Sequence, residues 1–294
     1  VCGYWMISRS LVWARWKESR GGGWVRSILY SFFSDDASRI GLYLSLHAMN
    51  AAFALVHGVH EQRPHAIYRA GLAMIDCVAL LFAVVVAKRA SRPVNADYTF
   101  GHHRMYVLSG FLLSVVVMLD SVLRAMHALE MFIWGPEPNE PQEMGRISLF
   151  EAGIGVFGVG MFHSSRRRHA RWPKDDNLEG VFLHALAELM DGFTLATAAL
   201  LTSSLTPRAR LGAMGTAMAA AIAARVAFPL LQSTTYTLLH ATPQELQSAV
   251  NVRLRKAALT EGVTDFVDAH FWPQAPGVYV GTLRVLLRPD VNEQ

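Results

Sequence analysis

The 294-residue chain is 52% hydrophobic and only 17% charged, and its mean hydropathy is +0.25. This composition is unusual for a soluble globular protein and typical of a protein that crosses a membrane several times. The chain has two cysteines, Cys2 and Cys77, which is too few for a disulfide framework or a thiolate zinc module.

The first 39 residues predict a cytoplasmic N-terminal segment that lies at the membrane surface. They hold four tryptophans among six basic residues, a combination typical of interfacial segments. We find no pattern of a cleavable signal peptide before the first apolar stretch. Because the sequence begins with Val1 rather than methionine, we expect sequence to be missing.

Six apolar stretches between residues 40 and 240 are long enough to cross a membrane. A hydrocarbon core of about 30 Å needs a helix of about 20 residues. The predicted spans are Ile40–Val59, Ala66–Ala87, Met105–Trp134, Ile147–Ser164, Leu178–Leu205 and Leu211–His240. We therefore predict an all-α bundle of six transmembrane helices.

Basic residues are distributed unevenly between the loops. The N-terminal segment, the 88–104 loop and the 165–177 loop hold fifteen Lys and Arg, whereas the three alternate loops hold four. Because basic residues favour cytoplasmic loops, both termini are predicted to be cytoplasmic. The basic run Arg166–Arg168 then faces lipid headgroups, and we expect it to bind membrane lipid rather than nucleic acid.

Ionisable residues inside the predicted spans are the main functional clue. His184 and Glu188 of the fifth span are four residues apart, so they share a helix face, and the second span carries Asp76. Four residues before Asp76, where a partner ligand would lie, stands Leu72. The sequence thus predicts an incomplete metal site, with water or Asp191 as the missing ligand. A proton site, or a relic whose polar groups bond one another, is the alternative interpretation.

Three arginines in the spans also need partners. Arg69 is expected either to pair with Asp76 or Glu188 or to reach the membrane interface. Arg124 lies four residues after Asp120 and is expected to pair with it. Arg225 of the sixth span also needs an acidic partner, and Asp191 and Glu151 are candidates that the sequence does not rank.

One nucleotide-binding motif is rejected. Gly153, Gly155 and Gly158 match a dinucleotide-binding fingerprint, which requires a strand before it and a helix that begins at it. These glycines lie inside an apolar span, where small residues allow neighbouring helices to approach closely.

The end of the chain, residues 241–294, predicts a partial cytoplasmic α/β domain. Gln244–Ala257 has the periodicity of an amphipathic helix, and Val263–Trp272 and Val278–Leu287 alternate as strands. One helix and two strands are marginally stable alone, so the unit needs further sequence or a partner.

Four motifs in this order resemble the cation diffusion facilitator family of zinc transporters. They are Asp76-Cys-Val-Ala-Leu-Leu, then Tyr98-Thr-Phe-Gly101-x-x-Arg104-x-x-Val107-Leu, then Asn177-x-x-Gly180-Val-x-x-His184, and His270-Phe-Trp272 with Arg288-Pro-Asp290-x-Asn292-Glu-Gln294. The resemblance implies a six-span bundle with a ferredoxin-like cytoplasmic domain. It also implies a tetrahedral zinc site on the second and fifth spans and a transporter rather than an enzyme.

The sequence departs from the family pattern at two ligand positions, because Leu72 and Glu188 stand where the family has other ligands. In this it is similar to an auxiliary subgroup that supports zinc movement from the cytosol into the Golgi or early secretory lumen. That similarity implies a homodimer, or a heterodimer with a competent relative. A competent zinc/proton antiporter and a metal-independent membrane scaffold or sensor are the alternatives.

Overall fold

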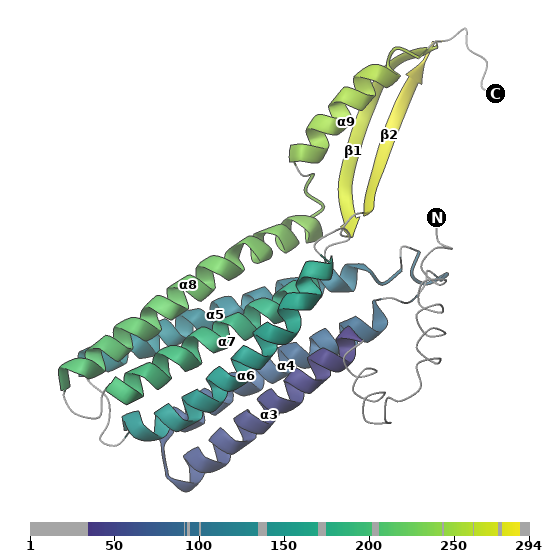
Figure 1. The fold of residues 1–294 in the computed structure, drawn as a ribbon. Coiled ribbons are helices and arrows are strands. Elements are labelled where there is room, and N and C mark those ends of the chain that lie inside the picture. Colours follow the sequence, from purple (N-terminus) through teal and green to yellow (C-terminus); the bar gives the residue numbers. More distant parts are fainter. Residues whose placement is uncertain are drawn as a thin grey trace, which may run out of the picture.

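The protein is described from a computed structural model in which six long helices lie side by side, with a small α/β unit at one end of the bundle (Figure 1). The structure describes residues 35–288 except 91, 93–94, 100, 135–139, 170–174, 202–205, 243, 261 and 276–277. Residues 1–34 of the predicted N-terminal segment and the last six residues of the tail motif lie outside the described residues.

Each predicted span coincides with one helix. The six helices are α3 (Asp36–His60), α4 (Pro64–Arg89), α5 (Arg104–Trp134), α6 (Glu140–His169), α7 (Asp176–Leu201) and α8 (Thr206–Leu238). The largest difference is in α6, which begins at Glu140, seven residues before the predicted start, because polar residues extend the helix beyond its apolar stretch.

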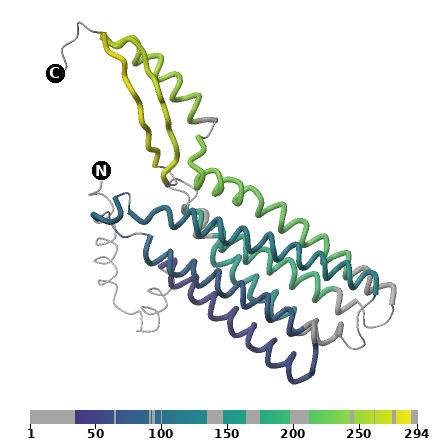
Figure 2. The backbone as a smooth tube through the Cα atoms, turned by 180° about the vertical axis from the view of Figure 1, so that it is seen from behind, coloured from purple at the N-terminus to yellow at the C-terminus, as the bar shows by residue number. Residues whose placement is uncertain are grey.

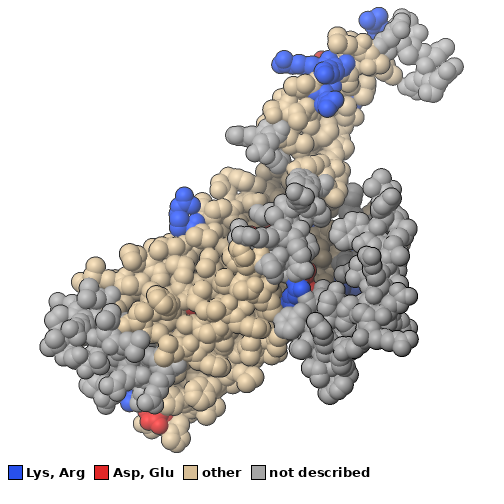
Figure 3. Space-filling view, in the orientation of Figure 1, with Lys and Arg blue, Asp and Glu red and all other residues tan. Residues whose placement is uncertain are grey.

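Four of the described helices are long and apolar enough to cross a membrane, namely α3, α4, α5 and α8. In α6 the corresponding apolar stretch is shorter, Ile147–His163. The described helix α7 carries four acidic residues, two of them in its first turn. The visible face of the bundle is mostly free of charged side chains, as a lipid-facing surface requires (Figure 3). The fold is thus mostly helical, with four membrane-capable helices.

Glycines let α6 and α7 approach closely. A Cβ atom on Gly155 would lie 2.6 Å from the Cα atom of Leu189, and one on Gly192 would lie 2.5 Å from the backbone nitrogen of Ala152. Gly155 and Gly158 of the rejected nucleotide motif therefore serve helix packing, whereas Gly153 meets nothing within 4 Å. This contact brings the carboxylates of α6 and α7 to the same level in the bundle.

A second contact fixes the beginning of α7 against α4 and α5. Ser109 donates a hydrogen bond to Asn177 Oδ1 at 2.6 Å, and Asn177 Nδ2 donates one to the Ala83 carbonyl at 3.2 Å. Asn177 and Ser109 are buried, where an unpaired polar group would be costly. The resemblance motif that begins at Asn177 thus sets the height of α7 relative to α4.

The C-terminal unit contains helix α9 (Gln244–Ala257) and the antiparallel strands β1 (Val263–Ala275) and β2 (Val278–Leu287) (Figures 1 and 2). The predicted helix is confirmed, and β1 runs three residues beyond its predicted end, into the expected turn, because Pro273 still pairs with Tyr279. Arg104 Nε at the start of α5 donates to the Gln274 carbonyl at 3.2 Å and links the hairpin to the bundle.

Replacing Gly155 with alanine should destabilise the bundle, because the new Cβ atom would meet the backbone of Leu189. Overpacking of this kind costs about 1–3 kcal/mol of unfolding free energy. Thermal unfolding in detergent measures the effect. Gly153→Ala in the same helix is the matched control, since nothing lies within 4 Å of its Cβ position. Equal stability of the two variants would contradict close packing at Gly155.

Candidate metal site

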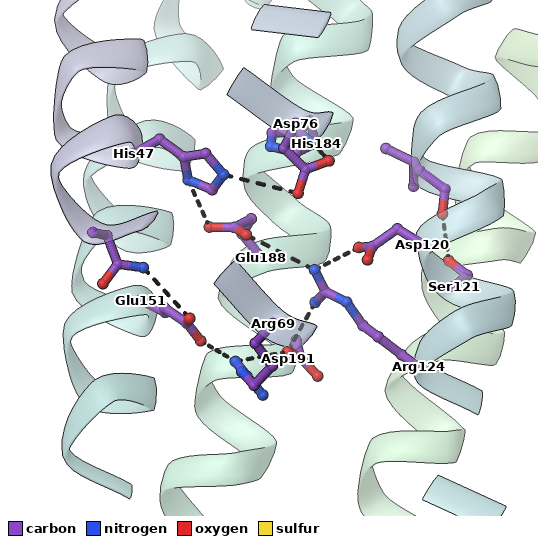
Figure 4. A network of polar contacts seen from close by, with 12 residues as sticks. His47, Arg69, Asp76, Asp120, Ser121, Arg124, Glu151, His184, Glu188 and Asp191 are labelled. Atoms are coloured by element: carbon purple, nitrogen blue, oxygen red, sulfur yellow. Dashed lines mark hydrogen bonds and ion pairs between the residues drawn. The ribbon is translucent and has the colours of Figure 1, made fainter. Parts of the chain in front are cut away.

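Four buried side chains from three helices meet in the middle of the bundle (Figure 4). His184 and Glu188 come from adjacent turns of α7, Asp76 comes from α4, and His47 comes from α3. Each side chain is at most 7% exposed. The structure therefore brings together the three expected ligands and adds a histidine that the sequence interpretation did not include.

The four side chains contact one another through their ligand atoms. His47 Nε2 lies 3.8 Å from Asp76 Oδ2, and His47 Nδ1 lies 3.3 Å from Glu188 Oε2. On the other side, His184 Nδ1 lies 3.9 Å from Asp76 Oδ1. One ligand atom from each of the four residues lies within 4.8 Å of the others. This spacing is small enough for one ion to contact all four.

Several polar atoms of this cluster make no regular hydrogen bond among the described residues, although the His47 nitrogens lie within ion-pair distance of two carboxylates. These include both ring nitrogens of His47, Nε2 of His184 and Oε2 of Glu188. Buried polar atoms are normally paired, and an unpaired group often marks a site for an ion or water. The orphaned lone pairs therefore fit a cation.

The donor set also fits a divalent ion in charge and geometry. Two neutral imidazoles and two carboxylates give a net charge of −2, and zinc binds nitrogen and carboxylate oxygen in tetrahedral sites. Tyr43 bounds the cluster, with its ring 6.1 Å from that of His47 and 6.3 Å from that of His184. The cluster is thus enclosed by an aromatic residue one turn before His47.

The sequence contains a signal that identifies His47. Tyr43, His47 and Asn50 follow one another at intervals of four and three residues, so they lie on the same face of α3. All three are buried. An ionisable residue near the middle of a membrane-capable helix indicates a functional site, and His47 meets this condition. Sequence reasoning missed this donor because the family pattern places its ligands on the second and fifth spans and not on the first.

Asp191 lies outside the four-residue cluster. It forms ion pairs with Arg124 Nη1 at 2.9 Å and with Arg69 Nη2 at 3.5 Å. Asp191 thus neutralises arginines rather than supplying the missing ligand.

The expectation that Arg69 pairs with Asp76 or Glu188 is corrected. Arg69 points into the bundle and pairs with Glu151 and Asp191, because its position seven residues before Asp76 places it one layer away from the metal site. The predicted pair of Asp120 and Arg124 is confirmed, at 2.5 Å. Arg124 also lies 3.8 Å from Glu188 Oε1, so Glu188 faces both the cluster and an arginine.

Arg225 is exposed on α8. Its two candidate partners pair with other arginines instead, Glu151 with Arg69 and Asp191 with Arg124. Leu72 lines a small cavity that extends from the metal-site carboxylates past both arginines. The leucine therefore faces the same polar interior as Asp76, but it offers no ligand atom.

The sequence model of the cation efflux transmembrane domain matches residues 69–239. Among curated proteins, the chain is 22% identical to a probable zinc transporter protein of Dictyostelium discoideum, over 94% of this chain and 45% of that protein. It is 25% identical to metal tolerance protein C2 of Arabidopsis thaliana, over 87% of this chain and 65% of that protein. It is 20% identical to human zinc transporter 7, over 92% of this chain and 86% of that protein.

The chain spans about half the length of the Dictyostelium relative and about two thirds of the Arabidopsis one. The family match begins inside α4 and continues to the end of α8, and it contains Asp76, His184 and Glu188. Cation efflux proteins are membrane transporters and not enzymes. Because the family domain covers more than half of its residues, the chain belongs to the cation efflux family.

Proposed function

We propose that the chain binds zinc at His47, Asp76, His184 and Glu188 and moves it across a membrane. The observation that carries this proposal is the convergence of four buried donors, one ligand atom of each within 4.8 Å of the others. A site with a neutral imidazole pair and two carboxylates binds a divalent cation without leaving a net charge in the bundle. Three of the four donors, all except His47, lie within the cation efflux domain, where transported metal must pass.

Zinc is the preferred cargo for two reasons. Mixed nitrogen and oxygen donors suit zinc better than magnesium or calcium, which take oxygen ligands. The relatives in Dictyostelium and human are named zinc transporters. The exchange of zinc for protons is part of the proposal for a competent chain.

The proposed topology has six spans within residues 40–240, with both termini and the 241–294 unit in the cytoplasm. Six side-by-side helices and the excess of basic residues in alternate loops support it. The predicted ferredoxin-like fold of the C-terminal unit needs more strands than the two described. A homodimer or heterodimer would add protein surface to this marginal unit.

A second candidate is an auxiliary subunit that pairs with a competent relative in the Golgi or early secretory membranes. Leu72 favours it, because the second span then supplies one ligand and not two. In this feature and in its tail motif, the sequence resembles zinc transporter six. A metal-independent scaffold is the third candidate, and it requires that the four-donor cluster binds no cation.

The first test is zinc binding by the purified chain in detergent, measured by calorimetry. His47→Ala should weaken zinc binding by about tenfold or more, because it removes one of four ligands from a buried site. His60→Ala is the matched control on the same helix, since the His60 side chain is 83% exposed. Equal affinities for the two variants would exclude His47 as a ligand.

Transport is tested in vesicles that contain the chain alone or with a competent relative. A chain with its own site should take up zinc alone and lose most uptake in His184→Ala, which removes a buried donor. An auxiliary subunit should show uptake only with the relative present. Absence of zinc binding together with absence of uptake in both conditions would leave the scaffold as the explanation.

Topology is tested with engineered glycosylation acceptors in cells. An acceptor near Glu140 should be glycosylated, because the 135–146 loop is proposed to face the lumen. An acceptor near Gly22 should remain unmodified. The opposite pattern would overturn the six-span topology.

A further inference from the structure

Next to the metal site, polar contacts connect five helices in one continuous network (Figure 4). From Glu188 on α7 the network passes to Arg124 on α5, back to Asp191 on α7, and then to Arg69 on α4. Arg69 contacts Glu151 on α6, and the network returns to α3 because Asn50 Nδ2 donates to Glu151 Oε1 at 3.4 Å. Its members are Asn50, Arg69, Asp120, Arg124, Glu151 and Asp191, and we call them the arginine layer.

The arginine layer lies between the metal site and the end of the bundle where α3 meets α4. Arg69 precedes Asp76 by seven residues on α4, which is about 10 Å at about 1.5 Å per residue. Asp191 follows His184 by the same number of residues on α7, which runs in the opposite direction, so both displacements point to that end. A cation that leaves the metal site toward this end must cross the layer.

The cavity inside the layer is too small for a hydrated metal ion. Its volume is about 30 Å³, and it is lined by Asp76 and Glu188 on one side and by Arg69 and Arg124 farther along. A buried water needs about 10–15 Å³, so the space holds about two water molecules. The guanidinium groups thus stand directly on the route out of the site.

The charges of the layer show what the arginines do there. Asp120, Glu151 and Asp191 alone would form a path of three carboxylates that attracts cations. Arg69 and Arg124 neutralise two of these three charges, and their guanidinium groups occupy the carboxylates that a passing cation would otherwise contact. An arginine in a narrow pore creates an electrostatic barrier to cations.

We infer that Arg69 and Arg124 form a cation barrier that closes the metal site toward the α3–α4 end of the bundle. Arg124 is held by Asp120 at 2.5 Å and Asp191 at 2.9 Å, both closer than Glu188 at 3.8 Å. Arg124 is therefore held by carboxylates of the layer and not mainly by Glu188 of the metal cluster. A metal ion crosses toward this end only when the ion pairs of the layer open, so these arginines determine the rate of that step.

The inference rests on the proposed transport function, but its test requires no zinc. A single cysteine is placed at Ala73, which lines the cavity one turn after Arg69, in a background with Cys2→Ser and Cys77→Ser. Two small methanethiosulfonate reagents modify it, one carrying an aminoethyl cation and one a neutral methyl group. Glu61→Cys, exposed at the same end of the bundle, gives their intrinsic rate ratio.

At Ala73→Cys the cationic reagent should react about tenfold more slowly, relative to the neutral one, than at Glu61→Cys, because Arg69 and Arg124 already occupy the carboxylates that would otherwise attract a cation to the cavity. Arg124→Gln should remove this discrimination, and Arg124→Lys should keep it. Arg225→Gln is the matched control, because Arg225 is exposed on α8 and should leave the ratio unchanged.

A ratio that stays the same in both Arg124→Gln and Arg69→Gln would overturn the barrier, as would loss of discrimination in Arg124→Lys. If Arg124→Gln alone does not fold, Asp120→Asn with Arg124→Gln removes the pair together and gives the same readout. Failure of zinc binding with an intact reagent ratio would reject the transport function and not the barrier.

Discussion

Five carboxylates buried in an apolar bundle are the constraint on which the rest of the structure depends. Asp76, Asp120, Glu151, Glu188 and Asp191 are each at most 8% exposed. An unpaired charge in this environment is costly, so every one needs a positive partner or a cation. Three of them pair with Arg69 or Arg124, whereas Asp76 and Glu188 converge with two histidines. The interior thus contains a layer in which arginine side chains neutralise the carboxylates, and a separate cluster whose carboxylates are suited to bind a metal ion.

Close helix packing makes that separation possible. Gly155 and Gly192 allow α6 and α7 to touch through their backbones, and the buried Asn177 fixes the height of α7 against α4. A shift of one turn, about 5.4 Å, would move Glu188 to the level of the arginines. Short polar side chains such as Asp76 reach only a few ångströms, so the positions of the helices decide which carboxylates meet histidine and which meet arginine.

The sequence predicted the helices well because their apolar runs are long, and it predicted the i,i+4 contacts because they depend on one helix alone. The Asp120–Arg124 pair and the shared face of His184 and Glu188 are of this kind. His47 and the partners of Arg69 depend on how separate helices rotate and slide against one another, which periodicity does not fix. Leu72 shows that the second span lacks one ligand, but it does not indicate which other span supplies a donor.

Leu72, His47 and Arg69 together determine which helices hold the candidate metal cluster and the arginine layer. A leucine on α4 removes a ligand from the second span, and His47 on α3 supplies a nitrogen donor to the same cluster. This donor comes from a helix that packs against α4, so a metal ion bound at the proposed site would connect α3, α4 and α7. Arg69 on α4 and Asn50 on α3 meet through Glu151 in the next layer. If the cluster binds metal as proposed, any movement of α3 and α4 relative to α7 that releases it must also strain the arginine layer, and this would couple release to the opening of the proposed barrier.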